Sequence, residues 1–173
     1  MGLKAQKGLF AEAGFVDAFN SRTVQVDSEP IKNYQSYGYR AGLFLNYPVK
    51  KFDVRLGAGV KQLFFSGRYQ TNNFTGNVSK FTANLSSLYR FGSSWKAGVA
   101  IDLENNRDFN EFRSKTSDLF RYNARVLVNY KISEQLFLNL DYCKALSPYE
   151  DYYLLTNPTD QITIGINYKL PWL

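Results

Sequence analysis

The sequence predicts an all-β fold in which eight antiparallel strands close up-and-down into a transmembrane β-barrel. Three observations support this prediction. Apolar and polar residues alternate with a period of two along most of the chain, the connections are short and long in turn, and aromatic residues gather at both ends of the apolar faces. With 173 residues, the chain suits one domain and is too short for two of ordinary size. We expect a single barrel domain over residues 1–173, in which residues 1–7 are an N-terminal stump or the remnant of a linker.

The eight strands follow from the alternation. The clear segments are residues 37–47, 52–61, 95–104, 120–130 and 162–170, and the weaker ones are residues 8–17, 79–91 and 136–146. Each segment is about 9–12 residues long, the length that a tilted strand needs to cross the hydrocarbon of a bilayer. The 3.6-residue period of an amphipathic helix is essentially absent.

The connections alternate in length. Residues 48–51, 92–94 and 131–135 form short turns, whereas residues 18–34, 66–78, 105–118 and 147–160 are expected to be long polar loops. Short turns on one rim and long loops on the other are typical of a barrel with a periplasmic and an extracellular side. An even number of strands then puts both termini at the rim of the short turns.

Alternation alone leaves open whether the apolar face points inward, as in a soluble lipocalin, or outward into lipid. Glycines cluster on the polar face, where they would leave room for long side chains inside a narrow barrel. These glycines are Gly38, Gly42, Gly57, Gly59, Gly98 and Gly165. The apolar face also carries almost no charge along the central part of any strand. Both features favour the membrane barrel.

Two aromatic girdles support the same choice, because amphipathic rings prefer the interface between membrane and water. At the rim of the short turns, the predicted girdle comprises Tyr47, Phe52, Tyr89, Phe91, Trp95, Tyr130 and Tyr168. At the opposite rim, it comprises Tyr37, Tyr39, Phe64, Phe81, Phe120, Tyr122 and Tyr142.

Three stretches carry a resemblance to known barrels. Residues 41–48 (AGLFLNYP) and 55–60 (RLGAGV) are similar to PorT-type outer-membrane barrels of Bacteroidetes, and the chain as a whole resembles the small Gram-negative outer-membrane barrels with an OmpA/OmpX-like layout. In the last strand, Thr163-x-Gly165-x-x-Tyr168-x-Leu170 resembles the signal that the barrel assembly machinery recognises. Pro171-Trp172-Leu173 follow, where many members of the family end on Phe.

This resemblance implies a location in the outer membrane of a Gram-negative bacterium. It also implies contact with outer-membrane lipid and lipopolysaccharide, and with the assembly machinery during biogenesis. Met1-Gly2 precedes Leu3-Lys4-Ala5 without an apolar segment, so we expect a mature form from which the signal peptide is absent.

The alternation places a set of charged residues on the inward-facing side of the predicted barrel. Its members are Glu12, Arg40, Asp53, Arg55, Lys61, Lys80, Arg90, Lys96, Asp102, Glu104, Arg121, Arg125, Asp141 and Lys169. Side chains just fill the lumen of an eight-stranded barrel, and buried charges must be paired. We therefore expect an electrostatic plug, with a narrow anion-selective pore as the alternative. Glu12 and Asp53 are expected near Arg40 and Arg55, although the unknown register leaves the pairs open.

Catalysis is not expected. The chain has no His, which excludes Ser-His and Cys-His mechanisms and His-ligated metals. Lipid A palmitoyltransferases and deacylases resemble this layout but rely on a His. Cys143 alternates inward and is predicted to be a small buried residue, and no cofactor is expected. The bases alternate into the lumen and form no exposed patch, which argues against a nucleic-acid partner.

Function is expected to reside in the loops, because a rigid scaffold presents its variable loops for contact. The candidate contacts are Tyr149, Glu150, Asp151, Tyr152 and Tyr153. We expect a non-enzymatic structural or interaction protein with a protein partner at these loops or at the periplasmic rim. A membrane-anchor domain of a longer envelope or signalling protein is the alternative.

Overall fold

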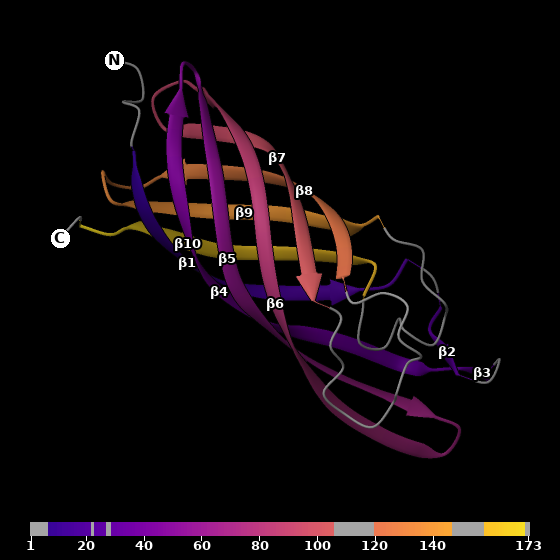
Figure 1. Cartoon of the computed structure of the whole chain (residues 1–173). Helices are drawn as coiled ribbons and strands as arrows, with labels where there is room; N and C mark the ends of the chain where they lie inside the picture. Colours follow the sequence, from indigo (N-terminus) through magenta and orange to yellow (C-terminus); the bar gives the residue numbers. More distant parts are fainter. Residues whose placement is uncertain (1–6, 22, 27–28, 106–119, 147–157, 172–173) are drawn as a thin grey trace.

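Eight antiparallel strands form a closed barrel in the structure, a computed structural model that describes residues 7–21, 23–26, 29–105, 120–146 and 158–171 (Figure 1). The barrel strands are β1 (Gly8–Phe19), β4 (Lys32–Val49), β5 (Phe52–Tyr69), β6 (Asn72–Phe91), β7 (Trp95–Asn105), β8 (Phe120–Lys131), β9 (Leu136–Ala145) and β10 (Asp160–Lys169). Each pairs with its neighbour in the chain order, and β1 pairs with β10 to close the ring. The predicted fold is confirmed. The described residues contain no helix that is long and apolar enough to span a membrane.

The three short connections lie at one end of the barrel, as predicted. Lys50 and Lys51 join β4 to β5, residues 92–94 join β6 to β7, and residues 132–135 join β8 to β9. Lys50 and Gly92 have φ angles of 53° and 65°, the left-handed conformation that a tight turn often needs. The start of β1 and the end of β10 lie at this end too (Figure 1). We call it the turn rim and the opposite end the loop rim.

The prediction of a loop over residues 66–78 is wrong. β5 and β6 pair without a break from Phe52↔Tyr89 to Tyr69↔Asn72, and only Gln70 and Thr71 connect them. The strands β4, β5 and β6 have 18, 18 and 20 residues, so the expected uniform strand length is also wrong for them.

These long strands run past the rest of the barrel as a three-stranded sheet, visible at the lower right of Figure 1. β7 pairs with β6 only as far as Thr82, and β1 pairs with β4 only as far as Ser36. We call residues 32–35, 65–69 and 72–76 the blade. The first long connection is also partly ordered, because it contains the short strands β2 (Gln25–Val26) and β3 (Glu29–Pro30).

The barrel wall has an apolar outside and a polar inside. Outward-facing Leu56, Val99 and Val126 are 63%, 62% and 55% exposed, although they lie in the middle of their strands. Inward-facing neighbours such as Arg55 and Arg125 are buried. This arrangement is the reverse of a water-soluble barrel and fits a hydrocarbon environment.

Glycines on the inner face have a different role from the predicted one at most positions. A Cβ on Gly38 would lie 1.9 Å from the carbonyl oxygen of Gln62, and one on Gly98 would lie 1.9 Å from that of Ser87. These glycines therefore allow adjacent backbones to approach in the strongly bent wall. Gly57 behaves as expected, because the atoms nearest to its absent Cβ belong to the side chains of Phe44 and Asn84.

Candidate functional site

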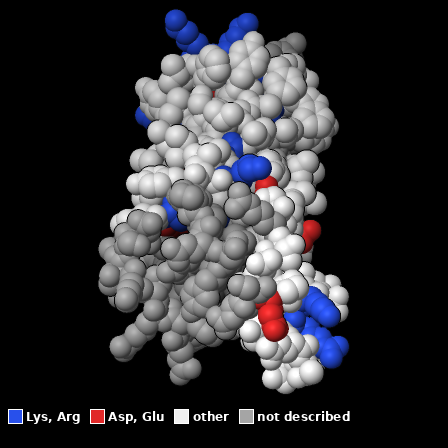
Figure 2. All heavy atoms as spheres, turned by 90° about the vertical axis from the view of Figure 1, so that its right-hand side faces the viewer, with Lys and Arg blue, Asp and Glu red and all other residues white. Residues whose placement is uncertain are grey.

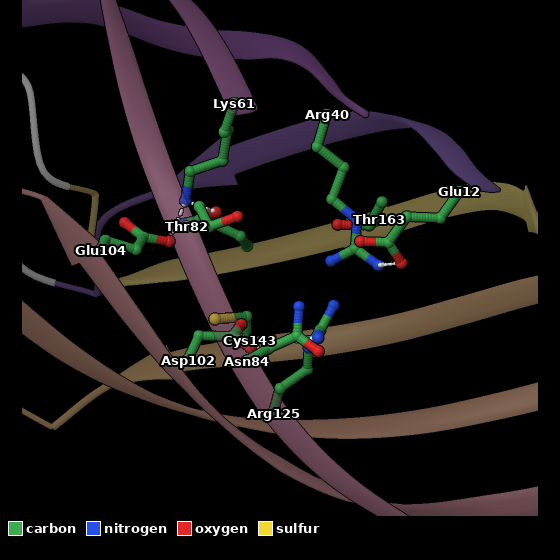
Figure 3. A pocket seen from close by; sticks show the side chains of 11 residues that line it. Glu12, Arg40, Lys61, Thr82, Asn84, Asp102, Glu104, Arg125, Cys143 and Thr163 are labelled. Carbon is green, nitrogen blue, oxygen red and sulfur yellow. Dashed lines mark hydrogen bonds and ion pairs between the residues drawn. The ribbon is translucent and has the colours of Figure 1, made fainter. Parts of the chain in front are cut away.

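The middle of the lumen is a small charged chamber to which all eight barrel strands contribute. Its lining comprises Glu12, Arg40, Lys61, Thr82, Asn84, Asp102, Glu104, Arg125, Cys143, Gln161 and Thr163. Figure 3 shows Arg40 and Arg125 approaching this space from different strands. The cavity encloses about 20 Å³, which is room for roughly one water molecule.

Asp141 is the centre of the first ion-pair group. Its Oδ2 lies 2.7 Å from Arg40 Nη2 and 3.7 Å from Arg125 Nη1. Arg40 also lies 3.5 Å from Glu12, and Arg125 lies 3.0 Å from Asp102. Two guanidinium groups thus share three carboxylates, from strands that are far apart in the sequence.

A second group lies nearer to the loop rim. Lys61 forms a buried ion pair with Glu104 and donates a hydrogen bond of 2.8 Å to Gln161 Oε1. Arg121, which is 1% exposed, donates a hydrogen bond of 2.5 Å to the backbone carbonyl oxygen of Pro158. These contacts connect β5, β7 and β8 to the start of β10 across the lumen.

A third group lies near the turn rim. Asp53 Oδ2 is 2.7 Å from Lys96 Nζ, and Asp53 Oδ1 is 3.7 Å from Arg90 Nε. Arg55 instead donates a hydrogen bond of 3.1 Å to Asn46. Glu12 therefore does lie beside Arg40, but the closest carboxylate to Arg40 is Asp141, and Asp53 pairs with Lys96 and Arg90.

Apolar layers flank the charged chamber. Toward the turn rim, Phe10 stacks on Phe44 at 5.1 Å between ring centroids and meets Phe137 at 6.2 Å. Lys96 lies over the Phe137 ring and Arg55 over the Phe44 ring, at 4.6 and 4.8 Å from the centroids. A second apolar cluster comprises Leu88, Ala100 and Leu127. Toward the loop rim, Val16, Ala18, Leu63 and Val78 form another.

The structure brings most of the predicted lumen set together. Asp53, Arg55, Lys61, Lys80, Lys96, Asp102, Glu104, Arg121, Arg125 and Asp141 are buried, and Glu12, Arg40, Arg90 and Lys169 are half-buried. The seven residues of the turn-rim girdle all face outward and are exposed. The proposed loop contacts Tyr149, Glu150, Asp151, Tyr152 and Tyr153 lie outside the described residues, as does most of the segment 105–118.

Sequence reasoning missed the aromatic cluster and the amide partners. Phe44 alternates onto the same face as Arg40 and Asn46, so its phase already placed it inside the barrel. Its contact with Phe10 and Phe137 depends on the pairing of β4, β1, β10 and β9, which the sequence does not give. Cys143 is buried, and the described residues contain no cluster of three His, Cys, Asp or Glu that could hold a metal.

A polar clasp joins β1 to β10 at the loop rim. Ser21 donates its backbone N–H to Thr159 Oγ1 at 2.9 Å, and Thr159 donates its own to Asn20 Oδ1 at 3.0 Å. Asp160 accepts hydrogen bonds from Thr159 and from the hydroxyl of Tyr142.

The comparisons with known proteins show the fold. The chain is similar to the outer membrane protein OprG from Pseudomonas aeruginosa, with a TM-score of 0.56, 15% identity and 99% of each chain covered. It is also similar to a de novo designed transmembrane β-barrel, with a TM-score of 0.51 and 14% identity, over 98% of this chain and 100% of the designed one. No protein-family profile and no curated protein sequence matches it.

Proposed function

We propose that the protein is a non-enzymatic integral barrel of a Gram-negative outer membrane. In this proposal, the lumen is closed to solutes, and the barrel is a scaffold that presents the blade and the long connections outside the cell. The observation that carries the membrane location is a reversal of polarity along β5 and β6. Along each of these strands, the outward-facing side chains change from apolar to polar, as expected at a boundary between lipid and water.

On the outer face of β6, Leu85 and Phe81 are 56% and 62% exposed, and farther along the strand the outward positions become Asn77 and Thr75. On the outer face of β5, the aliphatic series ends at Val60, and the outward positions that follow are Gln62, the aromatic Phe64, Ser66 and Arg68. An apolar surface that ends at an aromatic position is what a membrane boundary requires.

The closed lumen rests on the layers inside it. A conducting path would have to cross the Phe10, Phe44 and Phe137 cluster and then the paired charges around Asp141. The cavity among these charges holds about 20 Å³, far less than a continuous water column. A structural role as an electrostatic plug therefore suits these charges better than ion selection.

The decisive test combines stability and conductance. We expect the purified protein to need detergent or lipid, to migrate differently on a gel before and after boiling, and to pass no steady current in planar bilayers. The Asp53→Asn variant should unfold at a clearly lower temperature, because Lys96 and Arg90 lose their carboxylate, and should remain non-conducting. A steady anion current from the wild type, with unchanged stability in the variant, would establish a pore instead. A stable monomer without detergent would refute the membrane location.

Cysteine labelling tests the orientation. In a Cys143→Ser background, a cysteine at Asn73 on the blade should react with an impermeant reagent on intact cells. Cysteines at Ser93 or Ser133 in the short turns should react only after the cells are opened. The reverse pattern would invert the topology.

Three finer predictions are part of the same proposal. They are kinship with PorT-type barrels, recognition of the last strand by the assembly machinery, and a protein partner at the extracellular loops. The exposed blade supports the third, because it offers a rigid polar surface beyond the girdle. Crosslinking from Asn73 or Thr75 in living cells would identify such a partner.

A further inference from the structure

Lysines dominate the exposed charge of the turn rim. Lys7 precedes β1, Lys50 and Lys51 form the β4–β5 turn, and Lys131 and Lys169 end β8 and β10. Alternation turns Lys131 and Lys169 toward the lumen, so we call Lys7, Lys50 and Lys51 the lysine rim. Lys7, Lys50 and Lys51 are exposed, whereas Lys131 and Lys169 are half-buried.

The lysine rim forms a continuous arc because of the strand order. The strands β5, β4 and β1 are neighbours in the ring, and the three lysines lie at their ends. In Figure 2, Lys and Arg side chains project from the upper end, where the β4–β5 turn lies in Figure 1. Among the described residues of the turn rim, Glu134 is the exposed acid, and it pairs with Lys131 at 2.5 Å.

The opposite rim differs in its charge. Its described residues include the bases Lys32, Arg68 and Lys144 and the acids Asp17, Glu29 and Asp160, so both signs are interspersed. Figure 2 shows both colours at its lower end, which carries the blade. A single-sign surface at only one rim indicates a partner of the opposite sign at that rim.

The aromatic girdle next to the lysine rim indicates what that partner is. Lys7 Nζ lies 5.3 Å from the centroid of the outward-facing Tyr47 ring, and Lys51 directly precedes the outward-facing Phe52. Rings of this kind lie at the level of lipid headgroups, and the long stem of a lysine beside them carries its ammonium group to the phosphates. An acidic soluble protein would not require this adjacency.

We propose that the lysine rim binds the headgroups of anionic phospholipids in the leaflet that faces the short turns. This inference rests on the proposed membrane location and extends it to a preference for one lipid charge at one rim. The ammonium groups would pair with the phosphates, and the outward-facing rings would pack against the glycerol and upper acyl region.

Trp95 is a reporter at this rim, since it is 45% exposed and its ring centroid is 4.7 Å from that of Tyr130. A Trp172→Phe variant leaves Trp95 as the sole tryptophan. This variant would be inserted into phosphatidylcholine vesicles that contain either brominated phosphatidylglycerol or brominated phosphatidylcholine. Bromine quenches only a nearby ring, so the two lipids can be ranked directly.

We expect brominated phosphatidylglycerol to associate about fivefold more strongly than brominated phosphatidylcholine at low salt, the effect of about one lysine–phosphate contact. The preference should fall toward one in high salt and in a Lys7→Gln, Lys50→Gln, Lys51→Gln variant. If that variant does not refold, Lys50→Gln with Lys51→Gln provides the test. The control, Lys32→Gln with Arg68→Gln on the blade, should keep the preference.

Equal quenching by the two lipids, or a preference that survives loss of the lysines, would overturn the inference while leaving the membrane barrel intact. Binding of polyglutamate to the rim without any lipid preference would overturn it in favour of an acidic protein partner. If neither brominated lipid quenches Trp95, the chain is not in the bilayer and the proposed function itself fails.

Discussion

The membrane-spanning part of β5 and β6 and the blade beyond it are made from the same two strands. The apolar residues face outward in the first part and inward in the second. Within the barrel, Val60 and Leu85 face outward while Arg55 and Lys61 face inward. In the blade, Ser66 and other polar residues face outward, whereas Phe74 packs with Val24, Ile31, Tyr34 and Tyr69. The alternation continues through the boundary, but the face that is apolar changes with the solvent outside.

The two regions are consequently stabilised in different ways. In the proposed membrane location, lipid contacts the apolar outer surface of the barrel, so that surface does not need to be buried within the protein. The paired charges and aromatic clusters of the lumen therefore specify which strands meet. In the blade, water surrounds the sheet, and burial of apolar side chains supplies the stabilisation. Variants that alter one kind of interaction should affect one region and spare the other.

The largest effect is expected from Asp141→Asn. The Asp141 side chain is fully buried between Arg40 and Arg125. Its neutralisation leaves the two guanidinium groups with only Glu12 and Asp102 as carboxylate partners among the described residues, and should cost about 3–5 kcal/mol of unfolding free energy. Urea unfolding in lipid vesicles would measure it. Asp17→Asn, which changes an exposed carboxylate, should shift stability by no more than about 0.5 kcal/mol. Equal effects of the two variants would mean that the lumen charges are hydrated.

The outer faces can be compared with one substitution in two places. Val126→Arg puts a charge in the middle of the lipid-facing surface and should cost about 2–4 kcal/mol. Thr75→Arg puts the same charge on the outer face of the blade and should be close to neutral. A similar loss from both variants, measured by the same unfolding assay, would place the blade within the membrane.

The inner face of the blade is sensitive to loss of apolar packing. Phe74→Ala removes a ring that packs against Val24 and Ile31, and should destabilise the blade locally by about 1–3 kcal/mol. Hydrogen exchange should increase at residues 65–69 and 72–76 while the barrel amides stay protected. The outward neighbour Asn73→Ala is the matched control and should leave exchange unchanged. Loss of protection throughout the barrel would show that the two regions unfold as one.

The smallest effect is expected at alkaline pH. Burial raises the pKa of Tyr34 in the blade to about 12. The folded blade therefore favours the neutral phenol. This contribution is complete below pH 10, the ordinary pKa of Tyr, and is lost as the pH rises toward 12. Protection of the blade amides should fall over this window in the wild type. It should fall less in Tyr34→Phe, and a fall of equal size in both would assign the alkaline transition to other groups.

The blade also shows where inference from the sequence stops. Residues 66–78 are rich in Gly, Asn and Thr, which is typical of loops. Apolar and polar residues still alternate here, but the apolar residues lie on the inward-facing side. The outward-facing apolar stripe that identifies the membrane strands therefore ends at Phe64 and Phe81. Pairing with β4 and packing against Val24 and Ile31, which flank β2 and β3, make these residues strands, and both are contacts between distant parts of the chain.

For the barrel, the sequence alone determined the eight strands, the short turns and the face that each side chain occupies, because a period of two and the demands of lipid are local properties. Tertiary structure decided the partners. Arg40 meets Asp141 across 101 residues because closure of β1 on β10 brings β4 and β9 to the same lumen. Closure also brings Phe137 of β9 against Phe10 at the turn end of that lumen. Register and ring closure depend on contacts between residues that are far apart in the sequence. The charge pattern therefore predicts which residues form the plug, but only the closed barrel shows which of them pair.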